Sequence, residues 1–241
     1  MHSERPVNTV ARKKIVFVIV EGPSDEVALG AILSRLYSSD EVYVHIMHGD
    51  ITSEFIQSPK KNINTEVANQ IEKFASSYHF EKKDFKQILH IVDTDGTFIP
   101  NINVVEDINA EKPIYSLNEI RTKNKANLEE RNRRKKNNLN KLCLRKTIWG
   151  IPYQVYFMSC NLDHVLYDKL NSSDEDKEND AYQFARRYKN NIADFITFIS
   201  ESDFSVKDDY IKSWKFIKKD LNSLHRYTNL AIGLPNLKQE E

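Results

Sequence analysis

Apolar residues in the first two thirds of the chain form two kinds of pattern: short consecutive runs, and segments in which they recur every three or four positions. The run IVFVIV at residues 15–20 is apolar on both faces, which predicts a buried, parallel strand. The patterns predict, in order, strand 15–20, a helix beginning near Pro23, strand 42–47, helix 65–78, strand 88–92, strand 153–158 and helix 162–170. This alternation indicates an α/β fold, with a mostly parallel sheet and helices on both of its faces.

The last part of the chain keeps the helical pattern without intervening strands. Its apolar residues form two stripes, which are Phe184, Tyr188, Ile192, Phe195, Ile196 and Ile199, and Tyr210, Trp214, Ile217, Leu221 and Leu224. We therefore expect an α/β domain over residues 12–168 and a helical C-terminal region over 169–241 packed on it. Such stripes serve either as intramolecular core or as the contact surface of a homodimer, and both alternatives stay open.

The composition is that of a water-soluble globular protein, since 40% of the 241 residues are hydrophobic and 29% are charged. No apolar run reaches the roughly 18 residues of a membrane span, and the first residues lack the apolar stretch of a signal peptide. The two cysteines, Cys143 and Cys160, are too few for a disulfide framework or a four-ligand zinc site. We therefore expect a cytoplasmic protein with no membrane partner.

The net charge of zero, from 35 basic and 35 acidic residues, hides a strong segregation of charge. Residues 121–146 hold eleven Lys and Arg against two acids, whereas residues 172–180 hold five acids against one Lys. The basic segment, about 116–148, separates two predicted strands and is expected to be a helical insertion near the sheet edge. It could follow a phosphate backbone, be a solvated helix or dock on an acidic partner. The candidate nucleic-acid-binding residues are Arg131, Arg133, Arg134, Lys135 and Lys136.

Acidic residues follow two of the predicted strands at the point where each strand ends. Glu21 follows the first strand, and Asp93 and Asp95 follow the strand over 88–92. Asp25 lies one helical turn after Glu21 and can face the same crevice. Carboxylates that converge in this way repel one another unless a cation lies between them. Because oxygen ligands suit hard ions, the sequence predicts a Mg²⁺ or Mn²⁺ site at this edge.

These two segments, EGPSD at residues 21–25 and DTDG at residues 93–96, each placed after an apolar strand, resemble the Toprim domain. The resemblance covers about residues 13–110, with a continuation at 153–168, and is strongest to nucleases of the OLD family. It implies a Rossmann-like Toprim fold in which Glu21, Asp93 and Asp95 are catalytic and hold one metal ion.

In OLD-like proteins a further acid after a later strand helps to hold a second ion, and the resemblance places Asp163 in that role together with Asp25. A lysine often stabilises the transition state in such nucleases. By position, Lys215, Lys218 and Lys219 are the candidates, and nothing in the sequence chooses among them.

The resemblance further implies metal-dependent hydrolysis of phosphodiester bonds in DNA or RNA, including transfer RNA. The chain shows no nucleophilic tyrosine domain, as in topoisomerases, and no zinc module, as in primases. It also lacks the phosphate-binding loop of an ATPase, whereas OLD-family proteins fuse the nuclease to an ABC-type ATPase. The expectation is therefore the toxic effector of a bacterial anti-phage abortive-infection system, with the ATPase on a separate chain.

Three alternatives stay open. The chain could be a non-catalytic Toprim-like binding module or a maturation ribonuclease. The motif DTDGT at residues 93–97 also fits haloacid-dehalogenase phosphatases, with Asp93 as nucleophile and Asp95 as general acid. That family needs a later acidic pair, and the pair at residues 208–209 opens a predicted helix instead of following a strand. This third alternative also leaves Glu21 unexplained.

Overall fold

The computed structural model describes residues 13–38, 40–46, 51–53 and 62–235. Its strands are β1 (Ile15–Val20), β2 (Glu41–Ile46), β3 (Phe85–Asp93), β4 (Val104–Glu106), β5 (Ile114–Tyr115), β6 (Ile120–Thr122), β7 (Thr147–Ile148) and β8 (Ile151–Met158). Its α-helices are α1 (Pro23–Leu36), α2 (Ile63–Ser77), α3 (Lys125–Leu142), α4 (Leu162–Tyr167), α5 (Asp174–Tyr188), α6 (Ile192–Glu201) and α7 (Tyr210–Ile217). The predicted α/β class is confirmed. The end predicted for the second strand, at Met47, lies outside the described residues.

The central sheet has the strand order β2-β1-β3-β8-β7, and every neighbouring pair except β7–β8 is parallel. All six residues of β1 are buried, as its unbroken apolar sequence predicts for a strand covered on both faces. In β3, Asp93 pairs with Met158 at the end of β8. The segments that follow β1, β3 and β8 therefore leave the sheet at the same edge.

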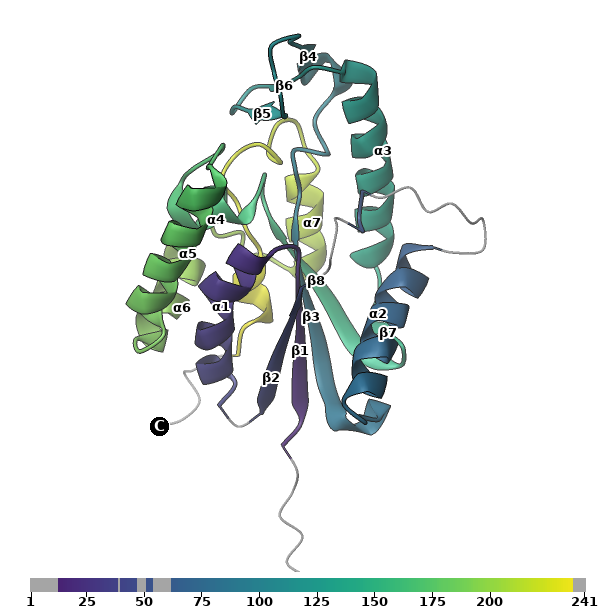
Figure 1. Ribbon diagram of the computed structural model, residues 1–241, viewed down its shortest axis with the longest axis vertical. Helices are drawn as coiled ribbons and strands as arrows, with labels where there is room; N and C mark the ends of the chain where they lie inside the picture. Colours follow the sequence, from purple (N-terminus) through teal and green to yellow (C-terminus); the bar gives the residue numbers. More distant parts are fainter. Residues whose placement is uncertain (1–12, 39, 47–50, 54–61, 236–241) are drawn as a thin grey trace, which may run out of the picture.

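Helices cover both faces of this sheet (Figure 1). Residues of α2, α3 and α7 pack on one face, while α1, α4, α5 and α6 pack on the other. Phe195 and Trp214, from the two apolar stripes of the tail, are buried in these two cores. The stripes therefore form intramolecular core in this chain. No helix in the described ranges is long and apolar enough to cross a membrane.

The C-terminal region also covers the outer edge of β8. The Tyr210 hydroxyl donates to the carbonyl of Val155 at 3.0 Å. Two residues further along the strand, Phe157 N donates to Asn229 Oδ1 at 2.8 Å and the Phe157 carbonyl accepts from Thr228 Oγ1 at 2.7 Å. These bonds satisfy backbone groups that an open edge strand would leave unpaired. Residues 169–235 are thus part of the body that supports the sheet.

A small sheet with the order β4-β6-β5 lies beyond the carboxyl ends of the central strands, at the top of Figure 1. The sequence did not predict it, because strands of two or three residues carry too little periodicity to be recognised. Val104 and Ile120 anchor it against Leu128 of α3 and Leu224. The basic segment consequently contributes a strand before its helix, and α3 is shorter than the insertion of about 116–148 expected from the sequence.

Candidate active site

Glu21 and Asp25 are positioned by the turn from β1 into α1. Gly22 is the N-cap of α1, and Pro23 occupies its first turn, where a missing N–H costs nothing. The Asp25 carboxylate accepts from Gly22 N at 3.0 Å, which closes a capping interaction and holds Asp25 beside the end of β1. Across the sheet, Glu21 Oε1 accepts from Asp93 N at 3.3 Å. The ends of β1 and β3 are therefore linked directly through a predicted site residue.

The turn that carries Asp93 and Asp95 is bonded to the segment after β8. Thr94 N donates to the carbonyl of Met158 at 2.9 Å, and Asp95 N donates to the carbonyl of Cys160 at 2.7 Å. The Thr94 hydroxyl accepts from Cys160 N at 2.8 Å. Thr94 is fully buried, so these bonds form away from solvent. They fix the backbone positions from which the side chains of Asp93 and Asp95 extend.

Gly96 completes this turn with a φ of +62°, a value that favours glycine. A Cβ at this position would lie 2.6 Å from Leu224 and 2.8 Å from Ile120. We expect Gly96→Ala to destabilise the fold by about 3 kcal/mol, from backbone strain together with overpacking. Urea unfolding followed by circular dichroism measures this effect.

Gly150→Ala is the matched control for that variant. Gly150 also has a positive φ, of +81°, but the nearest atom to an added Cβ is 4.0 Å away, on the flexible Lys82 side chain. We expect a loss of about 1 kcal/mol from backbone strain alone. Equal losses for the two variants would contradict the tight packing described around Gly96.

Lys135 lies inside this constellation of acidic residues. Its ammonium contacts Glu21 Oε1 at 3.4 Å and also pairs with Asp95 Oδ2. The Lys135 side chain has no exposed surface, whereas those of Glu21 and Asp95 are 17% and 21% exposed. A buried ammonium is stable only when it is paired, and here the carboxylates from two strand ends supply the pairing.

Two further contacts attach α3 to the turn after β3. Arg131 Nη2 donates to the carbonyl of Asp95 at 3.0 Å, and the Thr97 hydroxyl donates to the carbonyl of Asn132 at 2.6 Å. With the pairing of Lys135, the helix is therefore held against residues 95–97 at three places along its length. The basic helix is part of the site and not merely a neighbour of it.

The carboxylates perturb one another strongly. Burial raises the pKa of Asp93 well above its usual range, and the nearby charges of Glu21, Asp25 and Asp95 raise it further, while Lys135 acts in the opposite direction. Burial also raises the pKa of Asp25 to about 6, with a contribution from the charge of Asp163. The charges of the five predicted metal ligands thus influence one another in a chain. Glu21, Asp25 and Asp95 act on Asp93, and Asp163 acts on Asp25.

Asp163 lies on α4, directly after β8, and its side chain is 6% exposed. Its pKa is raised by burial, with Lys177 opposing that rise from 3.7 Å away. Lys177 belongs to the acidic segment that forms the start of α5. Asp163 therefore has a resident positive partner of its own.

The five predicted nucleic-acid-binding residues occupy different environments. Lys135 is buried, so its expected place on an exposed basic surface is wrong. Arg131 is engaged with Asp95, and Arg134 Nε donates to the carbonyl of Ser53 at 2.9 Å. Arg133 and Lys136 are exposed, although Arg133 also pairs with Glu130 at 2.7 Å.

The periodicity of α3 contains a signal that would have identified Lys135. The helix buries Leu128, Asn132, Lys135, Leu139 and Leu142, which recur every three or four positions. Lys135 lies in the middle of this stripe. A lysine at a core position of an otherwise polar helix indicates a buried acidic partner. The three lysines expected from the resemblance do not take this place: Lys215 and Lys219 are exposed, and Lys218 lies over the rings of Phe98 and Trp214.

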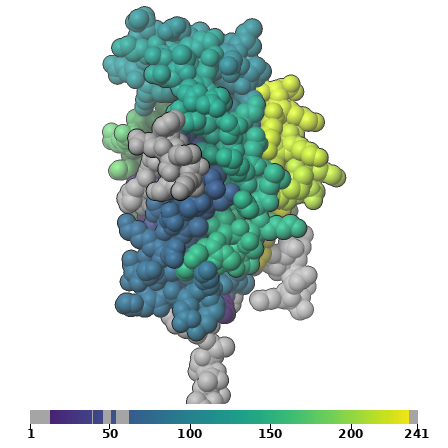
Figure 2. Space-filling model, turned by 90° about the vertical axis from the view of Figure 1, so that its right-hand side faces the viewer, coloured from purple at the N-terminus to yellow at the C-terminus, as the bar shows by residue number. Residues whose placement is uncertain are grey.

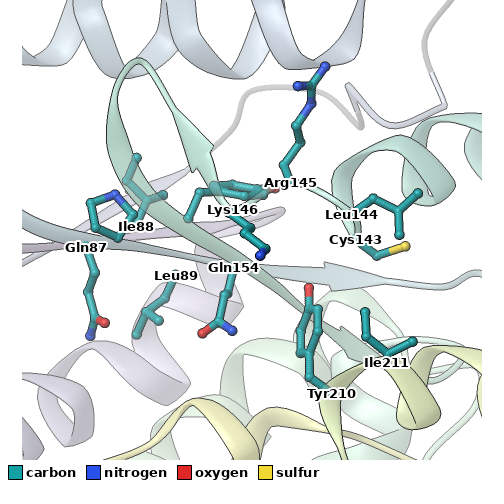
Figure 3. Close-up of a pocket in the computed structure, with 12 residues that line it drawn as sticks. Gln87, Ile88, Leu89, Cys143, Leu144, Arg145, Lys146, Gln154, Tyr210 and Ile211 are labelled. Atoms are coloured by element: carbon teal, nitrogen blue, oxygen red, sulfur yellow. The ribbon is translucent and has the colours of Figure 1, made fainter.

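A cavity of about 500 Å³ opens elsewhere, beside the first residues of β3 and β8 (Figure 3). Its lining includes Gln87, Lys146, Gln154 and Tyr210 and, within the described part of the chain, no carboxylate. It therefore lies at the opposite end of β3 from Asp93 and is separate from the acidic site. A second cavity, of about 360 Å³, lies between residues 97–101 and α3, with Asn132, Arg133 and Lys136 in its lining. This second cavity adjoins the turn that carries Asp95.

Within the described residues, no three Asp, Glu, His or Cys side chains are arranged so that they could hold a metal ion. At the strand ends, the ammonium of Lys135 engages oxygen atoms of Glu21 and Asp95. No family model, curated protein or solved structure matches this chain.

Proposed function

We propose that this chain is a metal-dependent, Toprim-like nuclease that hydrolyses phosphodiester bonds of DNA or RNA. One observation carries the proposal: Glu21, Asp93 and Asp95 lie at the ends of two neighbouring parallel strands, where Glu21 Oε1 accepts from Asp93 N and the charges of Glu21, Asp25 and Asp95 all act on Asp93. The carboxyl edge of an open parallel sheet is where α/β proteins place their ligands. Asp93 and Asp25, whose pKa values are raised by burial and by neighbouring charges, lie at this edge, and carboxyl groups perturbed in this way are typical of catalytic sites.

The donor atoms at these strand ends are carboxylate oxygens, the type of ligand that Mg²⁺ and Mn²⁺ prefer. Glu21, Asp93 and Asp95 would hold one ion, and Asp25 with Asp163 would help to hold a second. A bound ion would lower the pKa of an attacking water and neutralise charge on the phosphate. The chain itself contributes the orientation of the carboxylates, through Asp93 N donating to Glu21 and through the bonds of Thr94.

The exposed basic groups of α3 support a nucleic-acid substrate. Arg133 and Lys136 line the cavity beside the turn that carries Asp95, together with Glu129 and Glu130, and a backbone phosphate that entered it could approach the carboxylates. Figure 2 shows α3 running along one open face of the molecule, between the small sheet and α2. Among the described residues, no aromatic side chain lines this cavity, which favours contact with the nucleic-acid backbone over stacking on bases.

Individual residues argue against one alternative function and in favour of another. A haloacid-dehalogenase phosphatase would need the acidic pair at 208–209 in the site, but Asp209 instead caps α7 by accepting from Ile211 N and Lys212 N. A non-catalytic Toprim-like module is the second candidate. It is favoured by Lys135, since the ion pairs of a fully buried lysine with Glu21 and Asp95 can also be purely structural.

The biological part of the proposal rests on the resemblance to the OLD family. It assigns the chain to a bacterial anti-phage abortive-infection system, as a toxic effector held or released by a separate ABC-type ATPase. A maturation ribonuclease remains the competing role for the same chemistry. It differs in that the purified chain alone would process structured RNA.

The decisive experiment incubates the purified chain with plasmid DNA, single-stranded DNA and total transfer RNA, with Mg²⁺ or Mn²⁺ added in steps. We expect cleavage of at least one of these substrates that rises with metal concentration and stops on chelation. p-Nitrophenyl phosphate is included because a haloacid-dehalogenase phosphatase would hydrolyse it. Binding of nucleic acid without cleavage at any metal concentration would favour the non-catalytic module.

A further inference from the structure

We infer that Lys135 is the resident cation of the acidic site, and that its ammonium must release Glu21 and Asp95 before a divalent ion can bind there. The inference rests on the proposed function, since it concerns the metal site of that function. It assigns to the basic helix a role in controlling metal binding, in addition to any contact with nucleic acid.

The ammonium of Lys135 lies between the two strand ends that carry the proposed metal ligands. It contacts one carboxylate that follows β1 and one that follows β3, so it bridges the two strand ends that define the site. The oxygen atoms engaged, Glu21 Oε1 and Asp95 Oδ2, belong to two of the three residues proposed to hold the ion. An ion that used these oxygens would lie within a few ångströms of a positive charge.

The burial of the ammonium strengthens this repulsion. Lys135 is completely buried, so solvent does not screen its charge from the carboxylates of Glu21 and Asp95. Like charges at such a separation repel by several times the thermal energy at the effective dielectric of a protein site. Binding of a divalent ion is therefore coupled to movement of the lysine side chain.

The Lys135 side chain can move while α3 stays in place. Arg131 and Asn132 hold the backbone of α3 against residues 95–97 through their own hydrogen bonds. The four-carbon stem of lysine is flexible, whereas a helix fixed at two neighbouring positions is not. We therefore expect release of Glu21 and Asp95 by a change in the Lys135 side chain alone.

The test compares Mn²⁺ binding by isothermal titration calorimetry for the wild-type chain, Lys135→Met and Lys141→Met. Methionine keeps an unbranched stem and removes the charge. Lys141 lies on the same helix but is exposed, so its variant controls for net charge. We expect Lys135→Met to bind Mn²⁺ at least about tenfold more tightly than the other two proteins, which should bind alike. Equal or weaker binding by Lys135→Met overturns the inference.

A measurement on the wild-type chain keeps the inference testable if Lys135→Met does not fold. Lysines are acetylated with an amine-reactive ester, with and without saturating Mn²⁺, and modified sites are quantified by mass spectrometry. We expect Lys135 to be protected without metal and modified with it, while Lys141 is modified equally in both. Protection of Lys135 that persists at saturating Mn²⁺ overturns the inference. Failure of every protein to bind Mn²⁺ would instead overturn the proposed metal site itself.

Discussion

Replacing Asp93 with asparagine is expected to lower metal-dependent cleavage by about a thousandfold or more. The substitution removes one of the three proposed ligands from the centre of the cluster, where Glu21, Asp25 and Asp95 all influence Asp93. In other enzymes, the loss of a group that acts directly on developing charge lowers the catalytic rate by a comparable factor. Initial rates at saturating Mg²⁺, with the best substrate found for the wild-type chain, provide the measurement.

The same variant should be more stable than the wild-type chain at neutral pH in the absence of metal. Asp93 has a pKa raised well above its usual range in the folded state, so its ionisation opposes folding as the pH rises. Asparagine has a similar shape and does not ionise. Asp203→Asn, at an exposed position just after the end of α6, serves as the control and should change neither stability nor cleavage.

Loss of cleavage together with a gain in stability would distinguish a functional carboxylate from a structural one. If Asp93 served only to hold the fold, Asp93→Asn would lower stability instead. Retention of full cleavage by Asp93→Asn would remove the proposed catalytic role of the cluster.

The sequence predicts those helices and strands in which burial follows one regular pattern along the whole element. The strand over residues 15–20 is buried on both faces, so every position carries the same signal. The strand over 85–93 and the strand over 151–158 were likewise recognised from their apolar runs, with small errors at their ends. The positions of Glu21, Asp93 and Asp95 then followed from the rule that parallel strands end at one edge.

The remainder depended on contacts between distant segments. The spacing of Leu128, Lys135 and Leu142 indicates that Lys135 faces inward. No local pattern, however, identifies the distant Glu21 as its partner. The charge of the whole segment suggested an exposed surface, whereas the burial of single positions decides which charges are accessible. The small sheet was missed for a similar reason, because Ile120 finds its partners in Leu128 and Leu224 and not in its own neighbours.

In the absence of added metal, the wild-type chain should lose stability as the pH rises through about 6. Burial raises the pKa of Asp25 from 3.8 to about 6 in the folded state. A raised pKa in the folded state means that the stabilisation is fully present below the unfolded pKa and is lost above the folded one. The shift corresponds to about 3 kcal/mol, and screening at this partly exposed side chain lowers the expected change to on the order of 2 kcal/mol.

Asp25→Asn isolates this contribution. Asparagine can still accept from Gly22 N, so the start of α1 should be preserved. Denaturant unfolding in a chelating buffer should give equal stabilities for the two proteins near pH 4, and a more stable variant at pH 8. A difference that does not change with pH would contradict the raised pKa. Because a divalent ion stabilises the ionised carboxylates, saturating Mg²⁺ should remove most of the wild-type loss at pH 8, and a loss that persists would argue against a cation site beside Asp25.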